Sequence, residues 1–246
     1  MTADRWTRTV RQQLALGRSL PLGGPGDGAW IADGVARAVL RAAAGAVPGV
    51  RPGRLRIALA DPGHTYDPAV PQPPAALPPG PLRVTADFAA TAAEPLPATA
   101  ERLRTALLTA ATRRLGLTVA EIDLRATDLL DDASEDARSA SDQEPSPEPP
   151  EPVDPVAPDE RLVADAALTV PGVARLTGTL GGVGRAVHFE PGARTGNASL
   201  PRRHVWLELA VRADHRAVDV ARAVRTRVGD CLPDHPSVAV LVTSVS

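Results

Sequence analysis

The sequence predicts an α+β fold in which two small two-layer domains follow each other along the chain. Short segments with alternating apolar and polar residues, bounded by Pro and Gly, are typical of strands. Between them lie segments whose apolar residues recur every three or four positions, as in helices. The motif Val-Pro-Gly-Val occurs at Val47 and again at Val170. Each half is therefore expected to run helix, strand, strand, helix, strand, with the helices covering one apolar face of a sheet.

The end of the chain shows this pattern most clearly. Residues 204–212 alternate, which predicts a strand with Val and Leu on one face. Residues 214–232 change to helical spacing, and Asp214 is expected to cap that helix. Residues 237–245 are again β-branched and apolar, so they are predicted to form the closing strand.

The first half begins with a predicted helix over residues 30–46. Asp27 is expected to cap its start, and the Pro and Gly of Val47-Pro-Gly-Val50 are expected to end it. Two strands are predicted next, over residues 55–59 and 82–88, because both segments alternate.

A proline-rich loop, residues 61–81, separates these two strands. A second helix is predicted from Pro97 to Leu115, since Pro suits a first turn and Gly116 can end the helix in a left-handed conformation. The strand predicted over residues 119–129 closes the first half.

The second half begins with a predicted short helix over residues 161–169, followed by the second Val-Pro-Gly-Val motif. Residues 174–180 and 186–190 are predicted to form a β-hairpin around a glycine-rich turn at residues 181–184. This hairpin would add a strand that the first half lacks.

Alignment of the two halves indicates an internal repeat. Val84 of the first half matches Val205 of the second. In the closing strands the matching pairs are Ile122 with Val238, Leu124 with Val240, Ala126 with Val242, Thr127 with Thr243 and Leu129 with Val245. The alternative is chance similarity between segments rich in Ala and Val. We expect two tandem domains, because the unit is too long for a solenoid repeat.

Residues 131–160 set the domain boundaries. They contain eleven acidic residues, seven prolines and one Arg. Such a segment buries too little apolar surface to offset the entropy of ordering, so a disordered linker is predicted. The expected organisation is an N-terminal extension (1–29), a first domain (30–130), the linker (131–160) and a second domain (161–246).

The N-terminal extension has two open interpretations. Residues 1–20 have a basic amphipathic pattern, with Trp6, Val10 and Leu14 on one face. A helix of this kind can lie on an anionic membrane surface. The alternative is a helix that docks on its own domain, or a frayed end of the chain. The sequence has neither a signal-peptide pattern nor an apolar run of about 18 residues, so no transmembrane helix is expected.

The charge distribution suggests a second hypothesis. The formal net charge is −2, and the acidic linker separates two basic domains. A linker that screens these basic surfaces would weaken binding to nucleic acid or anionic lipid; the alternative is a soluble spacer. Nucleic-acid binding is less favoured, because the basic residues are dispersed, with one local patch at Arg202-Arg203-His204, and only Trp206 offers a stacking platform.

No motif points to catalysis, a cofactor or a metal. The chain has no HExxH, CxxC or GxSxG pattern, and the acidic pairs Asp131-Asp132 and Glu135-Asp136 fall in the linker. The single cysteine, Cys231, is expected to be structural, with a reactive thiol as the alternative. No two of the five histidines have the spacing of a zinc site, and His188 is expected to be a hydrogen-bonded structural residue; the five are His64, His188, His204, His215 and His235. We therefore expect no catalytic, cofactor-binding or metal-binding residues.

Several segments of the second half carry a family resemblance. The matching segments are residues 163–176, with the Pro-Gly-Val that ends a helix, residues 205–212, residues 218–228 with a Val-Ala-Arg-Ala-Val-Arg core, and residues 238–242. Together they resemble the alkaline shock protein family, also called the cell-envelope stress response family. The first half is similar over residues 31–39, 47–50 and 100–103.

The resemblance implies a cytoplasmic protein without catalytic activity that associates with the inner face of the cell membrane through protein partners, some of them membrane-anchored. The expected function is that of a scaffold or adaptor. The alternative is a protein that binds nucleic acid or anionic surfaces under control of its acidic linker. Two features depart from the family pattern, namely the second domain and the acidic insert.

Overall fold

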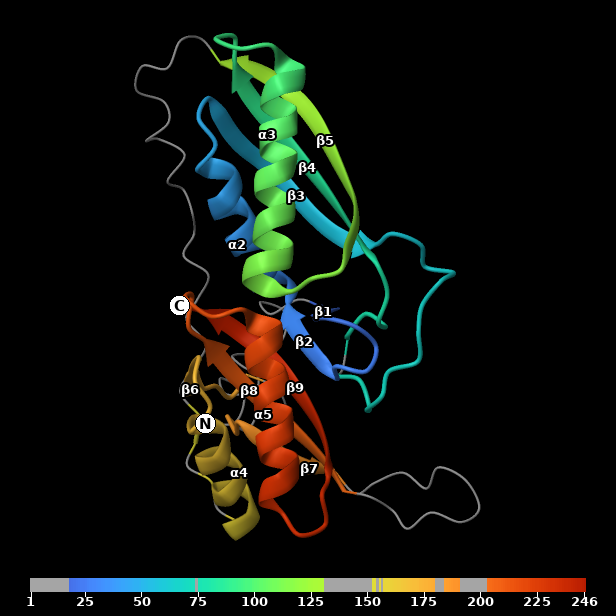
Figure 1. Cartoon of the computed structure of the whole chain (residues 1–246), viewed down its shortest axis with the longest axis vertical. Coiled ribbons are helices and arrows are strands. Elements are labelled where there is room, and N and C mark those ends of the chain that lie inside the picture. The colour runs from blue at the N-terminus through green and yellow to red at the C-terminus, as the bar shows by residue number, and fades with distance from the viewer. Residues whose placement is uncertain are drawn as a thin grey trace, which may run out of the picture.

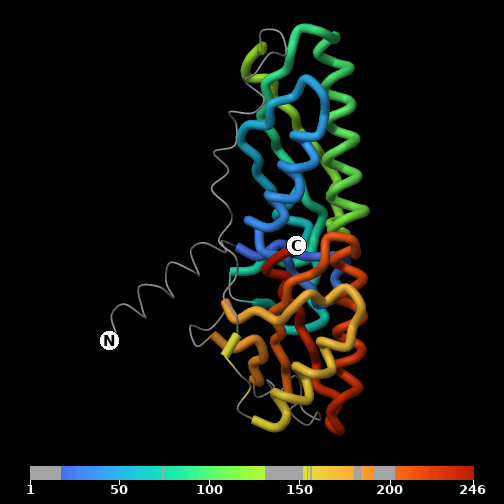
Figure 2. Tube along the Cα trace, turned by 90° about the vertical axis from the view of Figure 1, so that its left-hand side faces the viewer, coloured from blue at the N-terminus to red at the C-terminus, as the bar shows by residue number. Residues whose placement is uncertain are grey.

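A computed structural model describes residues 18–73, 75–130, 152–153, 155, 157–179, 184–190 and 203–246. The protein is a mixed α+β molecule with two sheets, and its helices lie on one side of them (Figure 1). We call residues 33–130 the first unit and residues 157–246 the second unit. The two units are stacked along the long axis, and Figure 2 shows α3 and α5 along the same side of the molecule.

The first unit has a three-stranded sheet in the order β3-β4-β5. Its elements are α2 (Asp33–Gly45), β3 (Val50–Leu59), β4 (Leu82–Thr91), α3 (Leu96–Thr109), the π-helical turn η1 (Ala110–Leu115) and β5 (Val119–Leu130). β3 and β4 are antiparallel, whereas β4 and β5 are parallel. The predicted strands and the helix from Pro97 are confirmed, and Gly116 ends that helix with φ 90°.

The second unit repeats this topology. Its elements are α4 (Pro158–Leu168), β6 (Val173–Leu176), β7 (Val187–Glu190), β8 (His204–Val211), α5 (Ala217–Cys231) and β9 (Ser237–Val245). β6 and β8 are antiparallel, and β8 and β9 are parallel. α4 begins at Pro158, so the last residues of the predicted linker belong to a helix; residues 131–150 lie outside the described residues.

The predicted hairpin in the second unit is wrong. β6 pairs with Val211 to Leu209 and β7 with Leu207 to His204, both antiparallel to β8. They are two pieces of one edge strand, interrupted between Leu176 and Val187. We call the described residues of this interruption, 177–179 and 184–186, the excursion. Glu208 bridges the interruption, because its C=O accepts from Thr177 N–H at 3.1 Å and its N–H donates to Ala186 C=O at 3.0 Å.

The start of the chain also differs from expectation. Ala29–Ala32 forms strand β2 rather than the first turn of the predicted helix, and Ser19–Pro21 forms β1. β1 pairs antiparallel with β2, and β2 pairs parallel with β9 at the far end of the chain. This pairing buries the side chains of β2 on both faces, which outweighs their helical spacing. The helix predicted over residues 1–20 is therefore wrong at its end, and residues 1–17 lie outside the described residues.

Equivalent residues of the two units make the same backbone contacts. Val84 pairs with Ile122, and the matching Val205 pairs with Val238. Each parallel pair then has a β-bulge, after Phe88 in the first unit and after Leu209 in the second. At each bulge a threonine hydroxyl donates to the strand opposite, Thr127 to Phe88 C=O and Thr243 to Leu209 C=O, both at 3.3 Å.

The Val-Pro-Gly-Val turns are alike as well. Gly49 and Gly172 have φ of 72° and 91°, a conformation that favours glycine. Each glycine C=O accepts a backbone hydrogen bond of 2.9 Å, from Thr91 in the first unit and Arg212 in the second. The two turns thus have the same backbone conformation and the same hydrogen bond.

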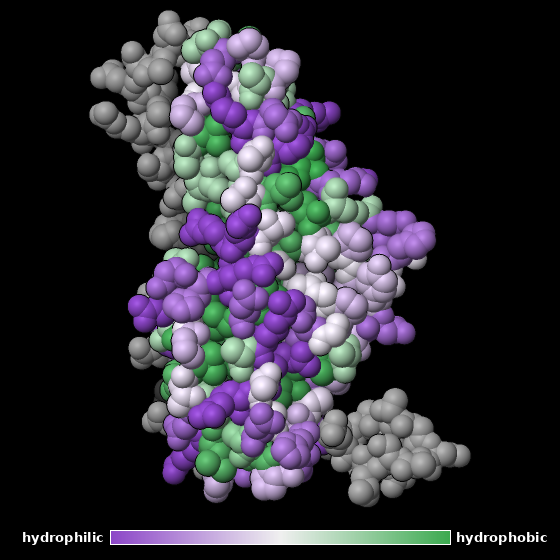
Figure 3. Space-filling model, viewed as in Figure 1, coloured by the Kyte–Doolittle hydropathy of each residue, from purple (hydrophilic) through white to green (hydrophobic). Residues whose placement is uncertain are grey.

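The two units meet at a polar junction. Arg222 on α5 donates two hydrogen bonds of 2.8 Å to the carboxylate of Asp27, which is not the helix cap that was predicted. Arg216 donates to Thr112 C=O at 2.9 Å, and a Cβ on Gly116 would lie 2.2 Å from a methyl carbon of Val218. Hydrophilic side chains gather across the middle of the molecule in Figure 3, where this junction lies.

The second sheet is covered on both faces, whereas the first is covered on one. The inner face of both sheets packs against the helices in one apolar cluster. On the outer face of the second sheet, Trp30, Trp206 and Leu241 pack against Val70 and Ala76 of the proline-rich loop. That loop belongs to the first unit, and β1 and β2 precede that unit, so the part of the chain before the second unit both extends and covers the second sheet.

Candidate functional site

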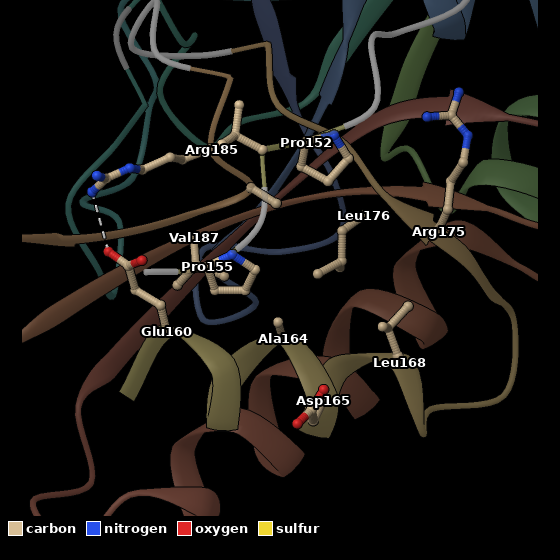
Figure 4. A pocket seen from close by; sticks show the side chains of 12 residues that line it. Pro152, Pro155, Glu160, Ala164, Asp165, Leu168, Arg175, Leu176, Arg185 and Val187 are labelled. Atoms are coloured by element: carbon tan, nitrogen blue, oxygen red, sulfur yellow. Dashed lines mark hydrogen bonds and ion pairs between the residues drawn. The ribbon is translucent and has the colours of Figure 1, made fainter. Parts of the chain in front are cut away.

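A pocket of about 330 Å³ opens beside α4 in the second unit (Figure 4). α4 contributes Glu160, Ala164, Asp165 and Leu168. The other lining residues are Pro152, Val153, Pro155, Arg175, Leu176, Arg185, Ala186 and Val187. The pocket therefore lies between α4, the interrupted edge strand and the end of the acidic segment.

The pocket has an apolar floor and a charged rim. Ala164, Leu176 and Val187 are buried beneath it, whereas Leu168 is 52% exposed at its edge. Arg185 pairs with Glu160 across 3.3 Å, as the dashed line in Figure 4 shows. An apolar floor with paired charges around it suits the insertion of an apolar side chain from a peptide or protein.

Local hydrogen bonds hold the pocket walls in place. The Val153 N–H donates to Gly184 C=O at 2.6 Å, which fixes the end of the acidic segment to the excursion. Gly178 is required there, because a Cβ would lie 2.2 Å from the same carbonyl oxygen. The Glu160 carboxylate also accepts from the Ala157 N–H at 3.4 Å, in the first turn of α4.

A buried polar cluster behind the pocket anchors the excursion. Glu208 is fully buried, and its carboxylate accepts hydrogen bonds from the Thr179 N–H at 2.7 Å and from the Thr179 hydroxyl. His188 Nε2 lies 3.8 Å from the other Glu208 oxygen and 2.9 Å from Arg185 C=O. The Glu208 carboxylate raises the pKa of His188 above its usual value. The Glu208 carboxylate thus holds Thr179 and His188 in place. His188 was expected to have such a structural role.

A second pair of buried polar side chains lies on the outer face of the same sheet. His204 Nδ1 is 2.7 Å from Ser237 Oγ, and burial lowers the pKa of the ring. His204 packs edge-on against Trp206, with ring centroids 4.7 Å apart. Trp206 is only 6% exposed, so the expected stacking platform for nucleic acid is not at the surface.

The remaining residues singled out from the sequence are dispersed. Cys231 is half-buried, and burial raises the pKa of its thiol. Asp214 is not a helix cap, because α5 begins at Ala217 and Asp214 instead hydrogen-bonds His215 at 2.8 Å. His64 contacts Asp61, and His235 contacts Gly229 C=O. The acidic pairs of the linker and residues Arg202 and 181–183 lie outside the described residues.

The described residues contain neither a group of metal-ligating side chains nor a helix that could span a membrane. Among those residues, no three His, Cys, Asp or Glu side chains are grouped so that they could hold a metal ion. Within the same ranges, no helix has both the length and the apolar character needed to cross a membrane.

Compared with known protein families and with curated proteins, the sequence matches none. The resemblance to the alkaline shock family therefore stays a prediction. The pocket and the buried Glu208 were not anticipated from the sequence. A signal for Glu208 existed, since it is the one acidic residue within an otherwise apolar strand, between Leu207 and Leu209.

Proposed function

We propose that this protein is a non-enzymatic scaffold or adaptor that acts through protein–protein contacts, and that the pocket beside α4 is one of its contact sites. The observation that supports this proposal most is the chemistry of the pocket. Its floor is apolar, and its rim carries the Glu160–Arg185 ion pair together with Arg175 and Asp165. Such a surface favours an apolar anchor residue flanked by polar contacts, as at the centre of many protein interfaces.

The placement of the ionisable side chains also supports a binding role. Thr179 and His188 both contact the buried Glu208 carboxylate, and these contacts fix the pocket wall. His204 is 2% exposed, so it is not available to a substrate from solution. These groups therefore stabilise the second unit, which is consistent with a scaffold.

We infer further that the two units arose by tandem duplication and that residues 131–156 link them. Shared strand order, shared bulges and the paired Thr127 and Thr243 hydrogen bonds support a common origin. The alkaline shock resemblance adds a cytoplasmic location at the inner face of the cell membrane, reached through membrane-anchored partners. This part of the proposal depends on the resemblance alone.

Two leucines of α4 provide a matched test. Leu168 lines the pocket and Leu162 does not, although they are 52% and 51% exposed. A photo-crosslinking amino acid at position 168 of the full chain should form protein adducts in native cells, and one at position 162 should form far fewer. The substitution Ala164→Arg, which fills the pocket, should abolish the adducts at position 168.

Equal adducts from both positions, or adducts that persist with Ala164→Arg in a folded chain, would show that the pocket is not the contact site. The thermal melt of each variant serves as the control for folding. A measured turnover of any small molecule that depends on Glu208 or His188 would contradict the non-enzymatic part of the proposal.

A further inference from the structure

The outer edge of the first sheet differs from the matching edge of the second. In the second sheet, the edge of β9 is covered by β2, which pairs along Val240 to Val242. In the first sheet, β5 pairs with β4 on one side, and no strand of the described residues pairs with its other side. β5 is twelve residues long, and an uncovered strand of this length is a template for pairing with another chain.

The charges along β5 restrict which partner fits. Outward-facing side chains of β5 include Glu121, Asp123 and Arg125, which lie opposite Arg83, Thr85 and Asp87 of β4. An acidic residue, Asp123, and a basic residue, Arg125, thus lie on either side of Leu124. A strand with this arrangement is complementary to its own copy running in the opposite direction, because a two-fold axis brings residue i beside the partner's residue j and j beside i.

Among two-fold axes placed at residues 122 to 125, only the axis at Leu124 avoids like charges. An axis at Leu124 puts Asp123 opposite Arg125 of the second copy, and does so twice. An axis at Asp123 or at Arg125 would instead put that residue opposite itself, which is destabilising for like charges. The register at Leu124 also places Ile122 opposite Ala126, so the inner faces stay aligned.

We propose that β5 pairs antiparallel with β5 of a second copy, centred on Leu124, to form a continuous six-stranded sheet across the dimer. The β-bulge at Thr127 lies at the margin of the pairing, so residues 122–126 are regular. Within each copy Arg83 pairs chiefly with Glu121 at 2.5 Å, while its distance to Asp123 is 3.6 Å. Asp123 therefore keeps a carboxylate oxygen for Arg125 of the second copy.

This proposal does not depend on the pocket of the second unit. A single strand pair buries less surface than a standard stable interface, so the dimer should form and dissociate with concentration. The expected monomer–dimer equilibrium lies in the range of about 1 µM to about 1 mM.

Charge exchange tests the pairing. Sedimentation velocity of the full chain over this concentration range should show a dimer for the native sequence. Asp123→Arg and Arg125→Asp should each weaken dimerisation at least tenfold, because each places two like-charged pairs across the axis. The double variant Asp123→Arg/Arg125→Asp should restore it, since the opposite charges then exchange places.

Arg56→Asp is the matched control, because Arg56 is exposed on β3 at the opposite side of the same sheet and should leave dimerisation unchanged. Thermal melts show whether each variant is folded. A native chain that stays monomeric throughout, or a folded double variant that dimerises no better than the single ones, would overturn the proposal. Dimerisation that is insensitive to all three variants would assign the interface to another surface.

Discussion

The three strands of the first sheet and the equivalent strands of the second sheet have the same order and register but opposite environments on their outer faces. In the first unit the outer positions of β4 and β5 carry charges, among them Asp87 and Arg125. The matching positions of the second unit are Glu208 and Leu241, which are 0% and 1% exposed. The inner face, the turns and the bulges thus define the shared fold, while the outer face follows whatever covers it.

The cover of the second sheet comes from the first unit. β1 and β2 extend the sheet, and the proline-rich loop packs Val70 and Ala76 on its outer face. The first sheet has solvent at the equivalent face, so alternating charges are tolerated there. Differences between the units therefore reflect contacts between them rather than a different topology.

The sharpest way to break the comparison is to exchange residues at equivalent outer positions. Leu241→Arg places a charge between buried residues and should destabilise the protein by about 3 kcal/mol or more. Arg125→Leu, at the matching exposed position, should change the free energy of unfolding by no more than about 0.5 kcal/mol. Urea unfolding at a protein concentration low enough to exclude pairing through β5 measures both, and equal losses would show that the outer faces do not differ.

The second contrast concerns the acidic residues of β4 and β8. Glu208→Ala leaves the Thr179 N–H and hydroxyl without their buried acceptor and should cost roughly 2 kcal/mol. Asp87→Ala, at the equivalent outward position, should cost less than about 0.5 kcal/mol. A larger loss for Asp87→Ala than for Glu208→Ala would mean that the carboxylate of the second unit does not anchor the excursion.

The third contrast is the pH dependence of stability that His188 gives to the second unit. Glu208 raises the pKa of His188 above its ordinary value of 6.5, so the folded state binds that proton more tightly than the unfolded state does. The resulting stabilisation is complete below that ordinary value and is lost as the pH rises through the raised pKa. Urea midpoints from pH 5.5 to about 9 should show this loss, and His188→Gln should remove it. A loss that persists in His188→Gln would assign the effect to another group.

The smallest contrast concerns the two bulge threonines. Thr243 is buried, and its hydroxyl contacts both Leu209 C=O and the Thr177 hydroxyl, whereas Thr127 is exposed. Thr243→Val should therefore cost about 1 kcal/mol, and Thr127→Val only a few tenths of a kcal/mol. Thermal melts of the two variants should rank them in this order, and equal shifts would indicate that both hydroxyls contribute only through the bulge itself.

Local patterns in the sequence predicted much of the fold. The Pro and Gly of each Val-Pro-Gly-Val motif end α2 and α4 near the expected positions, and the matched residues Val84 and Val205 hold the same place in their sheets. These features depend on a few neighbouring residues, so a single sequence reveals them.

The two errors in strand assignment involve contacts between distant segments. Ala29–Ala32 has helical spacing, but it pairs with β9 and becomes a strand. β6 and β7 fit a hairpin locally, yet both pair with β8. The sequence did contain one indication that β9 has neighbours on both faces. Residues 238–242 are all apolar, which is typical of a strand buried on both faces.

The candidate site was not predictable in the same way. The pocket is assembled from α4, the edge strand and Pro152 to Pro155, which no periodicity brings together. Glu208 could be noticed as an acidic residue in an apolar strand, but its partner Thr179 lies in an excursion that the hairpin prediction misplaced. The sequence alone shows the chemistry of single residues, whereas only the folded structure shows which of them lie close together.

The pairing of β2 with β9 also affects when the chain can complete its folding during synthesis. During translation Ala29 is made long before its partner Val240. The apolar edge of β2 that pairs with β9 therefore stays uncovered until residues 240–242 have been made. Contacts this far apart in sequence slow folding and leave strand edges exposed to aggregation until they form. A chain without β9 would also lose the strand with which β2 pairs.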